Sequence, residues 1–241
     1  MRVLVVTPTY NEIENIKKLI PALLSLREDI NVLVVDDNSP DGTGDYVDAY
    51  SKENNRVFVL RRPGKMGLGT AYIDGFKWAL KQTPSFDYII QMDADFSHEP
   101  AKILEFLEKL SDYDVVVGSR YLNGVSVVNW PIKRLLLSYF ANWYARTLSG
   151  LKIKDCTGGF RGYRSIVLEK FPFSYVTSDG YAFQIEMNYY CQKMGFRITE
   201  VPIIFVDRHA GTSKLSRRIV YEAVFKVLFL FLDRWCNLKK V

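Results

Sequence analysis

The chain carries the stretch Tyr88-Ile89-Ile90-Gln91-Met92-Asp93-Ala94-Asp95-Phe96-Ser97-His98, in which an apolar run ends at two carboxylates one residue apart. The run predicts a buried strand, and an open α/β sheet binds ligands beyond the carboxyl ends of such strands. Alternate side chains of an extended backbone project to the same side, so Asp93 and Asp95 can act together. Two carboxylates suit a hard divalent cation such as Mg²⁺, which keeps other positions for water and substrate phosphates. The stretch therefore predicts a metal-diphosphate site on a nucleotide-binding sheet.

Two other interpretations of this stretch have to be weighed. An Asp-x-Asp pair after a strand is often a solvated turn that holds no ligand. A calcium-binding loop would also use oxygen ligands at alternate positions, but it needs Gly at its sixth position and Glu at its twelfth. This chain has His98 and Leu104 there, which excludes the calcium loop. The metal interpretation then depends on support from the rest of the chain.

Strand and helix patterns alternate along the first half of the chain, with short connections between them. This alternation predicts a mostly parallel central sheet with helices on both faces. Polar groups follow the carboxyl ends of the predicted strands, which places them along one edge of the sheet. Pro21 should kink or split the first helix, and the turn-rich segment 155–161 should be a crossing connection. The predicted strands are 2–7, 31–35, 56–60, 87–92, 114–117 and 196–205.

Composition limits the class of protein. The 241 residues, 48% of them hydrophobic, suffice for one large domain or two small ones. Three widely separated cysteines and two histidines offer a poor zinc site and suggest a reducing compartment. His98 and His209 are expected at the surface rather than in catalysis. The N-terminal apolar run is too short for a signal peptide, so a cytoplasmic protein is expected.

The last part of the chain is basic and apolar. The net charge is +5, and residues 207–241 carry all of it, with eight Lys or Arg against three acids. Helices predicted over 132–148 and 216–238 have wide apolar faces flanked by basic residues, and they are either core helices or amphipathic helices at a membrane interface. The uncharged run Val227–Leu232 is too short to cross a bilayer. We therefore expect a catalytic domain over 1–215, a C-terminal amphipathic helix over 216–241, and a membrane surface rather than nucleic acid as partner.

Familiar nucleotide and nucleophile motifs are absent. Gly67-x-Gly69 follows a predicted strand, but the third glycine of a dinucleotide-binding fingerprint is replaced by Tyr72. There is no G-x-x-x-x-G-K-[ST] phosphate loop. No Ser, Cys and His set suggests a nucleophile triad. A hydride-transfer enzyme is thus disfavoured.

The sequence contains six informative motifs, at residues 7–12, 34–43, 92–100, 118–121, 155–161 and 208–214. Together they resemble the inverting GT-A glycosyltransferases of family 2, and more narrowly the dolichol-phosphate mannose synthases and their polyprenyl-phosphate relatives. The resemblance covers essentially the whole chain. It implies a GT-A fold and transfer of a hexose, most directly mannose from GDP-mannose, to a polyprenyl or dolichyl phosphate at the cytoplasmic membrane face. Mg²⁺ or Mn²⁺ would be the cofactor.

The resemblance also implies roles for single residues. Glu12 would bind ribose hydroxyl groups, and Ala94 would line the diphosphate between the two carboxylates. Asp95 would be the main metal ligand and Asp93 its support, with Ser97 an uncertain third ligand because some relatives have Gln there. Arg120 would face the reacting phosphates, Arg134 the lipid phosphate, and Arg208 and Lys214 would close over the nucleotide. The nucleobase would be held by Pro8, Tyr10, Val35 and Asp37.

The proposed chemistry suits this residue inventory. A metal ion can neutralise a diphosphate leaving group without proton transfer. A lipid phosphate is already anionic, so it needs no strong general base, which is consistent with a site rich in Asp and Arg and poor in His. Three alternatives stay open: a UDP-glucose-dependent enzyme, another family 2 transferase, and a catalytically silent nucleotide-binding or membrane-scaffolding module. A small membrane subunit is a further possible partner.

Overall fold

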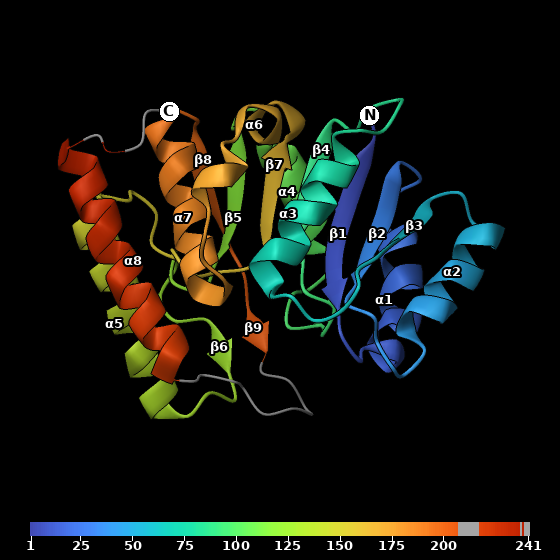
Figure 1. Ribbon diagram of the computed structural model, residues 1–241, viewed down its shortest axis with the longest axis horizontal. Coiled ribbons are helices and arrows are strands. Elements are labelled where there is room, and N and C mark those ends of the chain that lie inside the picture. The colour runs from blue at the N-terminus through green and yellow to red at the C-terminus, as the bar shows by residue number, and fades with distance from the viewer. Residues whose placement is uncertain (207–216, 237, 239–241) are drawn as a thin grey trace.

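The computed structural model describes residues 1–206, 217–236 and 238, and side chains of the last helix from residue 221 onward. Its centre is a seven-stranded sheet in the order β3-β2-β1-β4-β7-β5-β8 (Figure 1). The apolar runs of the sequence supply most of these strands, since Val and Leu pack well on both faces of a covered sheet. The strands are β1 (Val3–Thr9), β2 (Ile30–Asp36), β3 (Val57–Arg61), β4 (Tyr88–Gln91), β5 (Val115–Ser119), β7 (Arg161–Arg164) and β8 (Ile198–Pro202).

The sheet is parallel except for β7, which runs antiparallel to both neighbours. Gly162 of β7 is paired with Ile90 of β4 and with Val116 of β5. The sequence predicted a turn-rich crossing connection over residues 155–161. This prediction is wrong at residue 161, where β7 begins. The sequence Arg161-Gly162-Tyr163-Arg164 has no apolar run, so hydrophobic patterning cannot detect this strand.

The predicted last strand is also divided. The segment 196–205 contains β8 and the start of a separate short strand, β9 (Phe205–Val206). β9 pairs with β6 (Val127–Val128) in a two-stranded sheet. Figure 1 shows this small sheet beyond the carboxyl ends of the central strands. It therefore lies on the side of the molecule where the strand-end motifs were expected.

Helices cover both faces of the central sheet, as predicted. One hydrophobic cluster joins α1 (Ile13–Leu24), α2 (Thr43–Glu53) and α4 (Lys102–Lys109) to one face. The other cluster joins α3 (Leu68–Ala79), α6 (Ser165–Lys170) and α7 (Gly180–Lys193) to the opposite face. Val34 of β2 belongs to the first cluster and its neighbour Val35 to the second, as expected for a strand buried on both sides.

Local structure at Pro21 differs from the expectation, and Gly75 allows one helix to approach the sheet closely. Helix α1 runs without interruption through Pro21, so the predicted split of this helix is wrong. Pro21 lies in the last turn, where its missing N–H removes a single helix hydrogen bond. Gly75 lets α3 lie close to the sheet, because a Cβ there would stand 2.5 Å from Cγ1 of Val6.

Helices α5 (Ile132–Ser149) and α8 (Arg217–Cys236) pack side by side at the β8 end of the molecule, outside α7 (Figure 1). Val227 and Leu230 of α8 are fully or almost fully buried in the larger cluster. The Tyr144 hydroxyl of α5 donates a hydrogen bond to the Val224 carbonyl of α8, at 3.3 Å. Within the described ranges, no helix is long and apolar enough to cross a membrane.

Candidate functional site

A cavity of about 660 Å³ opens at the carboxyl ends of β1, β2 and β4. It collects residues from separate strand ends, because parallel strands of one sheet end at a common edge. Most of the predicted site residues line it: Pro8, Tyr10, Glu12, Asp37, Asp93, Ala94, Asp95, Ser97, Arg120 and Arg134.

Three predicted residues stand apart from this group. Val35 does not line the cavity, and its fully buried side chain packs toward Gly75 in the core. Any contact of Val35 with a nucleobase would have to come from its backbone. Arg208 and Lys214 lie outside the described residues.

The turn after β1 is held by the turn after β2. The Asn11 N–H donates to the Ser39 hydroxyl at 3.0 Å, and the Ile13 N–H donates to Asp41 at 3.1 Å. Asn11 itself has a φ of +61°, a conformation that Asn tolerates better than most residues. This arrangement presents the half-exposed Tyr10 ring to the cavity, with the Lys65 ammonium 4.4 Å from the ring centre. Lys65 was not predicted as a site residue.

The adjacent carboxylates at the end of β2 do different work. Asp36 is fully buried and accepts hydrogen bonds from the Thr9 and Ser39 hydroxyl groups, at 2.9 and 2.6 Å. Asp36 therefore connects the end of β1 to the turn that follows β2. Asp37 lines the cavity and accepts a hydrogen bond from Nη1 of Arg62 at 2.5 Å. Burial raises the pKa of Asp37, and the nearby Arg62 guanidinium offsets part of that shift.

Asp93 and Asp95 both face the cavity, as the opening stretch predicted. Oδ1 of Asp93 accepts a hydrogen bond from the Tyr72 hydroxyl at 2.7 Å. Oδ1 of Asp95 accepts two hydrogen bonds from Ser97, from its N–H at 3.0 Å and its hydroxyl at 2.6 Å. The Ser97 hydroxyl is thus placed as a support for Asp95 as well as beside any metal.

The donor set fits a hard divalent cation. Carboxylate and hydroxyl oxygens are the ligands that Mg²⁺ and Mn²⁺ prefer. Within the described part of the chain, no group of three or more His, Cys, Asp or Glu side chains could hold a metal ion. A cation held by Asp95, Asp93 and Ser97 would take further ligands from substrate phosphates and water, as is usual for Mg²⁺.

Tyr72 does not line the cavity, but its hydroxyl contacts Asp93, and the sequence interpretation gave it no role. Its ring is fully buried and stacks near Phe183, with centroids 6.2 Å apart and planes 4° from parallel. Burial raises the pKa of Tyr72 well above its ordinary value, and the Asp93 carboxylate raises it further. A hydroxyl with a raised pKa keeps its proton at neutral pH and can donate it in a hydrogen bond to Asp93. The only signal in the sequence was a Tyr at the third glycine position of an incomplete fingerprint.

His98 is buried, so the expectation that it lies at the surface is wrong. Its side chain lines the cavity, and its ring stacks on Phe160 with centroids 4.9 Å apart. The Asp93 N–H points to Nδ1 of His98 over a long 3.4 Å. The Phe160 ring explains the burial, because it becomes a neighbour only after β7 is inserted beside β4. His209 lies outside the described residues.

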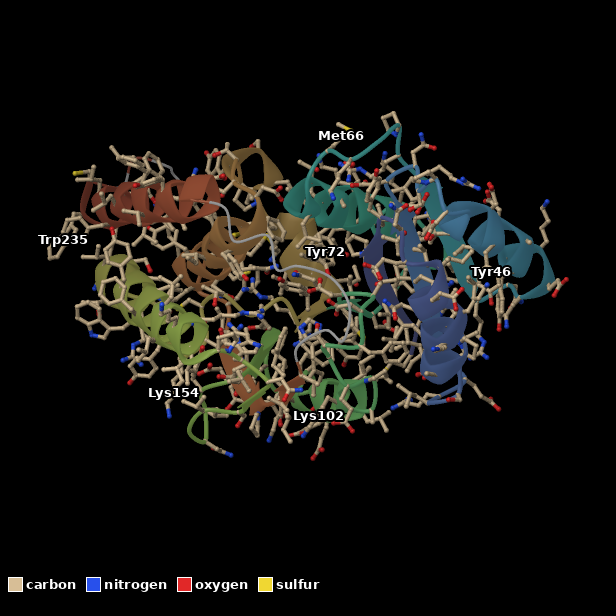
Figure 2. All side chains as sticks on the ribbon, turned by 90° about the horizontal axis from the view of Figure 1, so that it is seen from below. Tyr46, Met66, Tyr72, Lys102, Lys154 and Trp235 are labelled. Atoms are coloured by element: carbon tan, nitrogen blue, oxygen red, sulfur yellow. The ribbon has the colours of Figure 1, made fainter. Side chains whose placement is uncertain are left out.

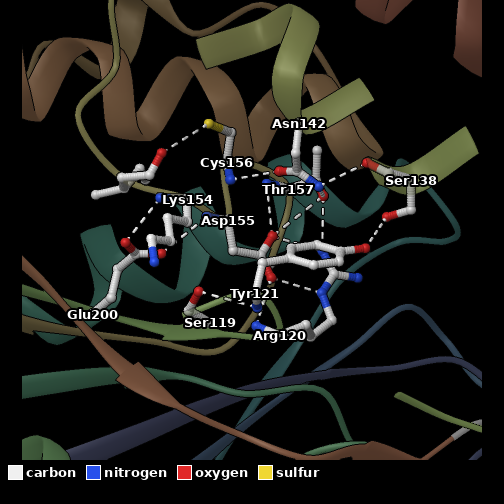
Figure 3. A network of polar contacts seen from close by, with 12 residues as sticks. Ser119, Arg120, Tyr121, Ser138, Asn142, Lys154, Asp155, Cys156, Thr157 and Glu200 are labelled. Carbon is white, nitrogen blue, oxygen red and sulfur yellow. Dashed lines mark hydrogen bonds and ion pairs between the residues drawn. The ribbon is translucent and has the colours of Figure 1, made fainter. Parts of the chain in front are cut away.

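Arg120, which follows β5, is fixed by a buried network (Figure 3). Its Nε and Nη2 atoms donate to the two oxygens of Asp155, each at 2.7 Å, and Nη2 also donates to the Thr157 hydroxyl at 2.8 Å. Burial would raise the pKa of Asp155, but the Arg120 guanidinium outweighs it and holds that pKa below its ordinary value. Asp155 therefore compensates much of the charge that Arg120 brings to the cavity wall. Nη1 of Arg120 makes no hydrogen bond with any described residue.

A second cavity, of about 130 Å³, adjoins the first. The two share wall residues, among them Arg120, Trp130 and Arg134. The Arg134 guanidinium lies 4.1 Å from the centre of the Trp130 ring. The rest of the second wall is mostly apolar and comes from α5, α7 and α8: Leu137, Phe140, Ala141, Tyr144, Ile185, Ala223, Val224 and Val227.

The outer faces of α5 and α8 expose large apolar side chains. Trp235 is 73% exposed and projects from one end of the molecule, far from the central Tyr72 (Figure 2). Within each helix these side chains recur mainly every three or four residues, which places them on one side of that helix. We call this set the apolar face: Ile132, Leu136, Tyr139, Phe140 and Trp143 of α5, and Tyr221, Phe225, Leu228, Leu232 and Trp235 of α8.

Comparison with known sequences identifies close relatives. A family model described as glycosyl transferase family 2 matches residues 4–171. The chain is 44% identical over 227 residues to the undecaprenyl-phosphate mannosyltransferase of Micrococcus luteus, which covers 94% of this chain and 93% of that protein. It is also 44% identical over 228 residues to the polyprenol monophosphomannose synthase of Mycolicibacterium smegmatis, covering 94% of this chain and 85% of that protein.

Solved structures confirm the predicted GT-A-like fold. Glucosyl-3-phosphoglycerate synthase from Mycobacterium tuberculosis, in complex with Mn²⁺, UDP and glucosyl-3-phosphoglycerate, superposes with a TM-score of 0.67 at 16% identity, over 99% of this chain and 81% of that chain. The mannosyltransferase PcManGT from Pyrobaculum calidifontis, in complex with GDP-Man and Mn²⁺, gives 0.59 at 18% identity, over 100% of this chain and 65% of that chain. Identities this low show shared architecture only.

Proposed function

The chain belongs to glycosyl transferase family 2, and we propose that it transfers mannose from GDP-mannose to a polyprenyl phosphate at the cytoplasmic face of a membrane. The observation that carries this proposal is the junction of the two cavities. A polar cavity with a pair of carboxylates meets an apolar cavity, and Arg120 and Arg134 lie in the wall that both share. A nucleotide sugar and a lipid phosphate need such neighbouring sites. One relative at 44% identity is named an undecaprenyl-phosphate mannosyltransferase, and the other a polyprenol monophosphomannose synthase.

The donor would occupy the polar cavity. Tyr10 and Pro8 present flat surfaces for stacking a base, and Asp37 offers a carboxylate acceptor beside them. Glu12 lines the same end and would accept hydrogen bonds from ribose hydroxyl groups. Lys65, above the Tyr10 ring, adds a cation near the nucleotide. Arg208 and Lys214 keep their proposed role of closing over the diphosphate.

Asp95 would hold a Mg²⁺ or Mn²⁺ ion, with Asp93 in support and Ser97 beside them. When bound, the ion supplies Lewis-acid stabilisation of the diphosphate as it leaves the sugar. The protein contributes the orientation of its ligands. Tyr72 restrains Asp93 and Ser97 restrains Asp95, through hydrogen bonds of 2.7 and 2.6 Å. Ligands held this way need little rearrangement when the substrate arrives.

The acceptor would reach the junction from the apolar cavity. Its first isoprene units fit walls such as Phe140 and Val227, while its phosphate would meet Arg134. A phosphate oxygen would attack the anomeric carbon as the bond from that carbon to the diphosphate breaks, which inverts the configuration to a β-linked product. Because the phosphate is already anionic, this step requires positioning and positive charge rather than a base.

The apolar face would dock on the membrane that contains the acceptor. The exposed aromatic residues Tyr139, Trp143 and Trp235 suit the headgroup region, where amphipathic rings concentrate. Basic residues of the same two helices would attract anionic lipids. A small membrane subunit that covers part of this face is the alternative occupant, and it would reveal itself if vesicles of lipid alone fail to bind the protein.

The direct experiment measures transfer of labelled mannose to undecaprenyl phosphate in anionic vesicles, with Mn²⁺ and with a chelator. GDP-mannose should be used, UDP-glucose should be a poor donor, and the chelator should stop the reaction. Preference for UDP-glucose would move the assignment to a glucosyltransferase. Full turnover in chelator would remove the proposed metal, and nucleotide binding without transfer to any lipid phosphate would indicate a catalytically silent module.

A further inference from the structure

Two glutamines form a buried amide pair between the sheet and α7. Gln91, at the end of β4, is fully buried, and Gln184 of α7 is 3% exposed. Nε2 of Gln91 donates to Oε1 of Gln184 at 3.0 Å. Burying amides costs free energy unless they are hydrogen-bonded, and apolar residues would fill the same space without that cost. The pair therefore calls for a role beyond packing.

A hydrogen-bond relay sets the orientation of both amides. The buried Tyr163 hydroxyl donates to Oε1 of Gln91 at 3.2 Å, which leaves Nε2 of Gln91 to donate onward. Oε1 of Gln184 receives that bond, so the Nε2 group of Gln184 is the part that remains. Gln184 lines the polar cavity, and its Nε2 donates no hydrogen bond to any residue the structure describes. A buried side chain thus presents a donor to the cavity.

The space in front of this donor is also bordered by a carboxylate. An ideal Cβ built on Gly159 would lie 3.6 Å from Nε2 of Gln184 and 3.5 Å from Oδ2 of Asp93. Oδ1 of Asp93 is engaged by Tyr72, so Oδ2 is the oxygen that borders this space. An amide nitrogen only donates and a carboxylate only accepts. A hydroxyl group, which does both, complements the two together, whereas a phosphate oxygen or a cation would satisfy only one of them.

We propose that Gln184 is a specificity-determining residue for the transferred sugar, whose Nε2 donates to one sugar hydroxyl while that hydroxyl donates to Oδ2 of Asp93. This inference rests on the proposed function, because it assumes a nucleotide sugar in the polar cavity. A carboxylate oxygen has more than one lone pair, so Asp93 can accept this bond and still support a metal. A sugar without that hydroxyl leaves both groups unpaired, and sites built around a hydroxyl discriminate strongly against such analogues.

The test compares the binding of GDP and GDP-mannose by calorimetry, with Mn²⁺ and without acceptor. The ratio of the two dissociation constants isolates the contribution of the sugar. In Gln184→Leu the dissociation constant of GDP divided by that of GDP-mannose should fall by about three- to tenfold, the equivalent of one neutral hydrogen bond. The dissociation constant of GDP itself should not change. Gln192→Leu is the matched control on the same helix, because Gln192 bonds to Lys152 and Gly150 away from the cavity.

A second variant keeps the inference testable if Gln184→Leu does not fold. Gly159→Ala adds a methyl group at ordinary contact distance from both polar atoms, without a strained φ, so the fold should tolerate it. It should weaken GDP-mannose and spare GDP. In addition, the deoxy analogue of GDP-mannose that lacks the hydroxyl bound by Gln184 should bind wild type and Gln184→Leu equally well.

The outcomes separate this inference from the proposed function. If the wild type favours a UDP-sugar over UDP but not GDP-mannose over GDP, the proposed donor is wrong, and the same ratio is then measured with the UDP pair. An unchanged sugar contribution in both variants overturns the role of Gln184. Equal losses for the nucleotide and the nucleotide sugar also overturn it, since they would assign Gln184 to the diphosphate or to structure.

Discussion

Replacing Tyr72 by Phe removes one buried hydroxyl group and leaves the ring in place. The hydroxyl donates to Asp93 at 2.7 Å, and the ring stays packed beside Phe183. We expect the variant to fold and to lose stability. Because the acceptor is charged, the lost bond should lower the free energy of unfolding by about 1.5–3 kcal/mol.

The same change should weaken metal binding. With the hydroxyl gone, the carboxylate of Asp93 can rotate, and Oδ2 is no longer held toward the cavity. Removal of a residue that orients a metal ligand typically costs about 10- to 100-fold in metal affinity. As Asp93 is proposed as support for the main ligand Asp95, we expect about tenfold for Mn²⁺ in the presence of GDP.

The assay titrates Mn²⁺ by electron paramagnetic resonance at saturating GDP, with unfolding by urea measured in parallel. Tyr163→Phe is the control, because its buried hydroxyl bonds to the neutral amide of Gln91 at 3.2 Å. The control should lose about 0.5–1.5 kcal/mol of stability and keep its Mn²⁺ affinity. If both variants bind Mn²⁺ like the wild type, Tyr72 is structural only and the reasoning about Asp93 is refuted.

Three other predictions follow from separate parts of the molecule. Asp155→Asn leaves Arg120 without its counter-charge, so it should lower the free energy of unfolding by about 3–5 kcal/mol at pH 7. Because the pKa of Asp155 is depressed in the folded state, the difference in free energy of unfolding between variant and wild type should narrow as the pH falls below about 3.9. A difference that grows in acid would contradict the assignment. Trp235→Ser should weaken binding to anionic vesicles by about tenfold in a sedimentation assay, as expected for about 1.5 kcal/mol of lost apolar burial. The control Leu104→Ser, on the exposed side of α4, should leave vesicle binding unchanged, and equal effects of the two substitutions would place the membrane contact elsewhere. Gly67→Ala forces a Cβ to 2.5 Å from the Asp179 carboxylate at a φ of +107°, so it should lower the free energy of unfolding by about 1–3 kcal/mol. It should also weaken GDP binding in calorimetry, and an unchanged GDP affinity would show that the loop around Gly67 does not contact the nucleotide.

The sequence could place the strand-end residues of the first cavity, because apolar runs reveal the strands that carry them. Pro8 lies near the end of β1, Asp37 comes directly after β2, and Asp93 comes two residues after β4. Because these strands are parallel, their carboxyl ends meet at one edge of the sheet. Val35 shows the limit of this reasoning. It belongs to the same motif as Asp37, but alternate residues of a strand face opposite sides, and its side chain points into the core.

The missed features depend on contacts between distant segments. β7 has no apolar run, so the burial of His98 on Phe160 and the relay through Tyr163 could not be anticipated. Tyr72 and Gln184 lie on helices, where a single polar residue gives no periodic signal. Their importance appears only when α3 and α7 pack against the end of β4, which brings their polar atoms beside Asp93.

The most direct measurement is transfer of labelled mannose from GDP-mannose to undecaprenyl phosphate by the wild type and by Asp95→Asn, each with Mn²⁺. The substitution keeps the shape of the side chain and removes the charge that would hold the cation. The account predicts turnover in the wild type and a loss of about a hundredfold or more in the variant, because the ion contributes several kcal/mol of stabilisation to the leaving group. Equal rates in the two proteins would contradict it.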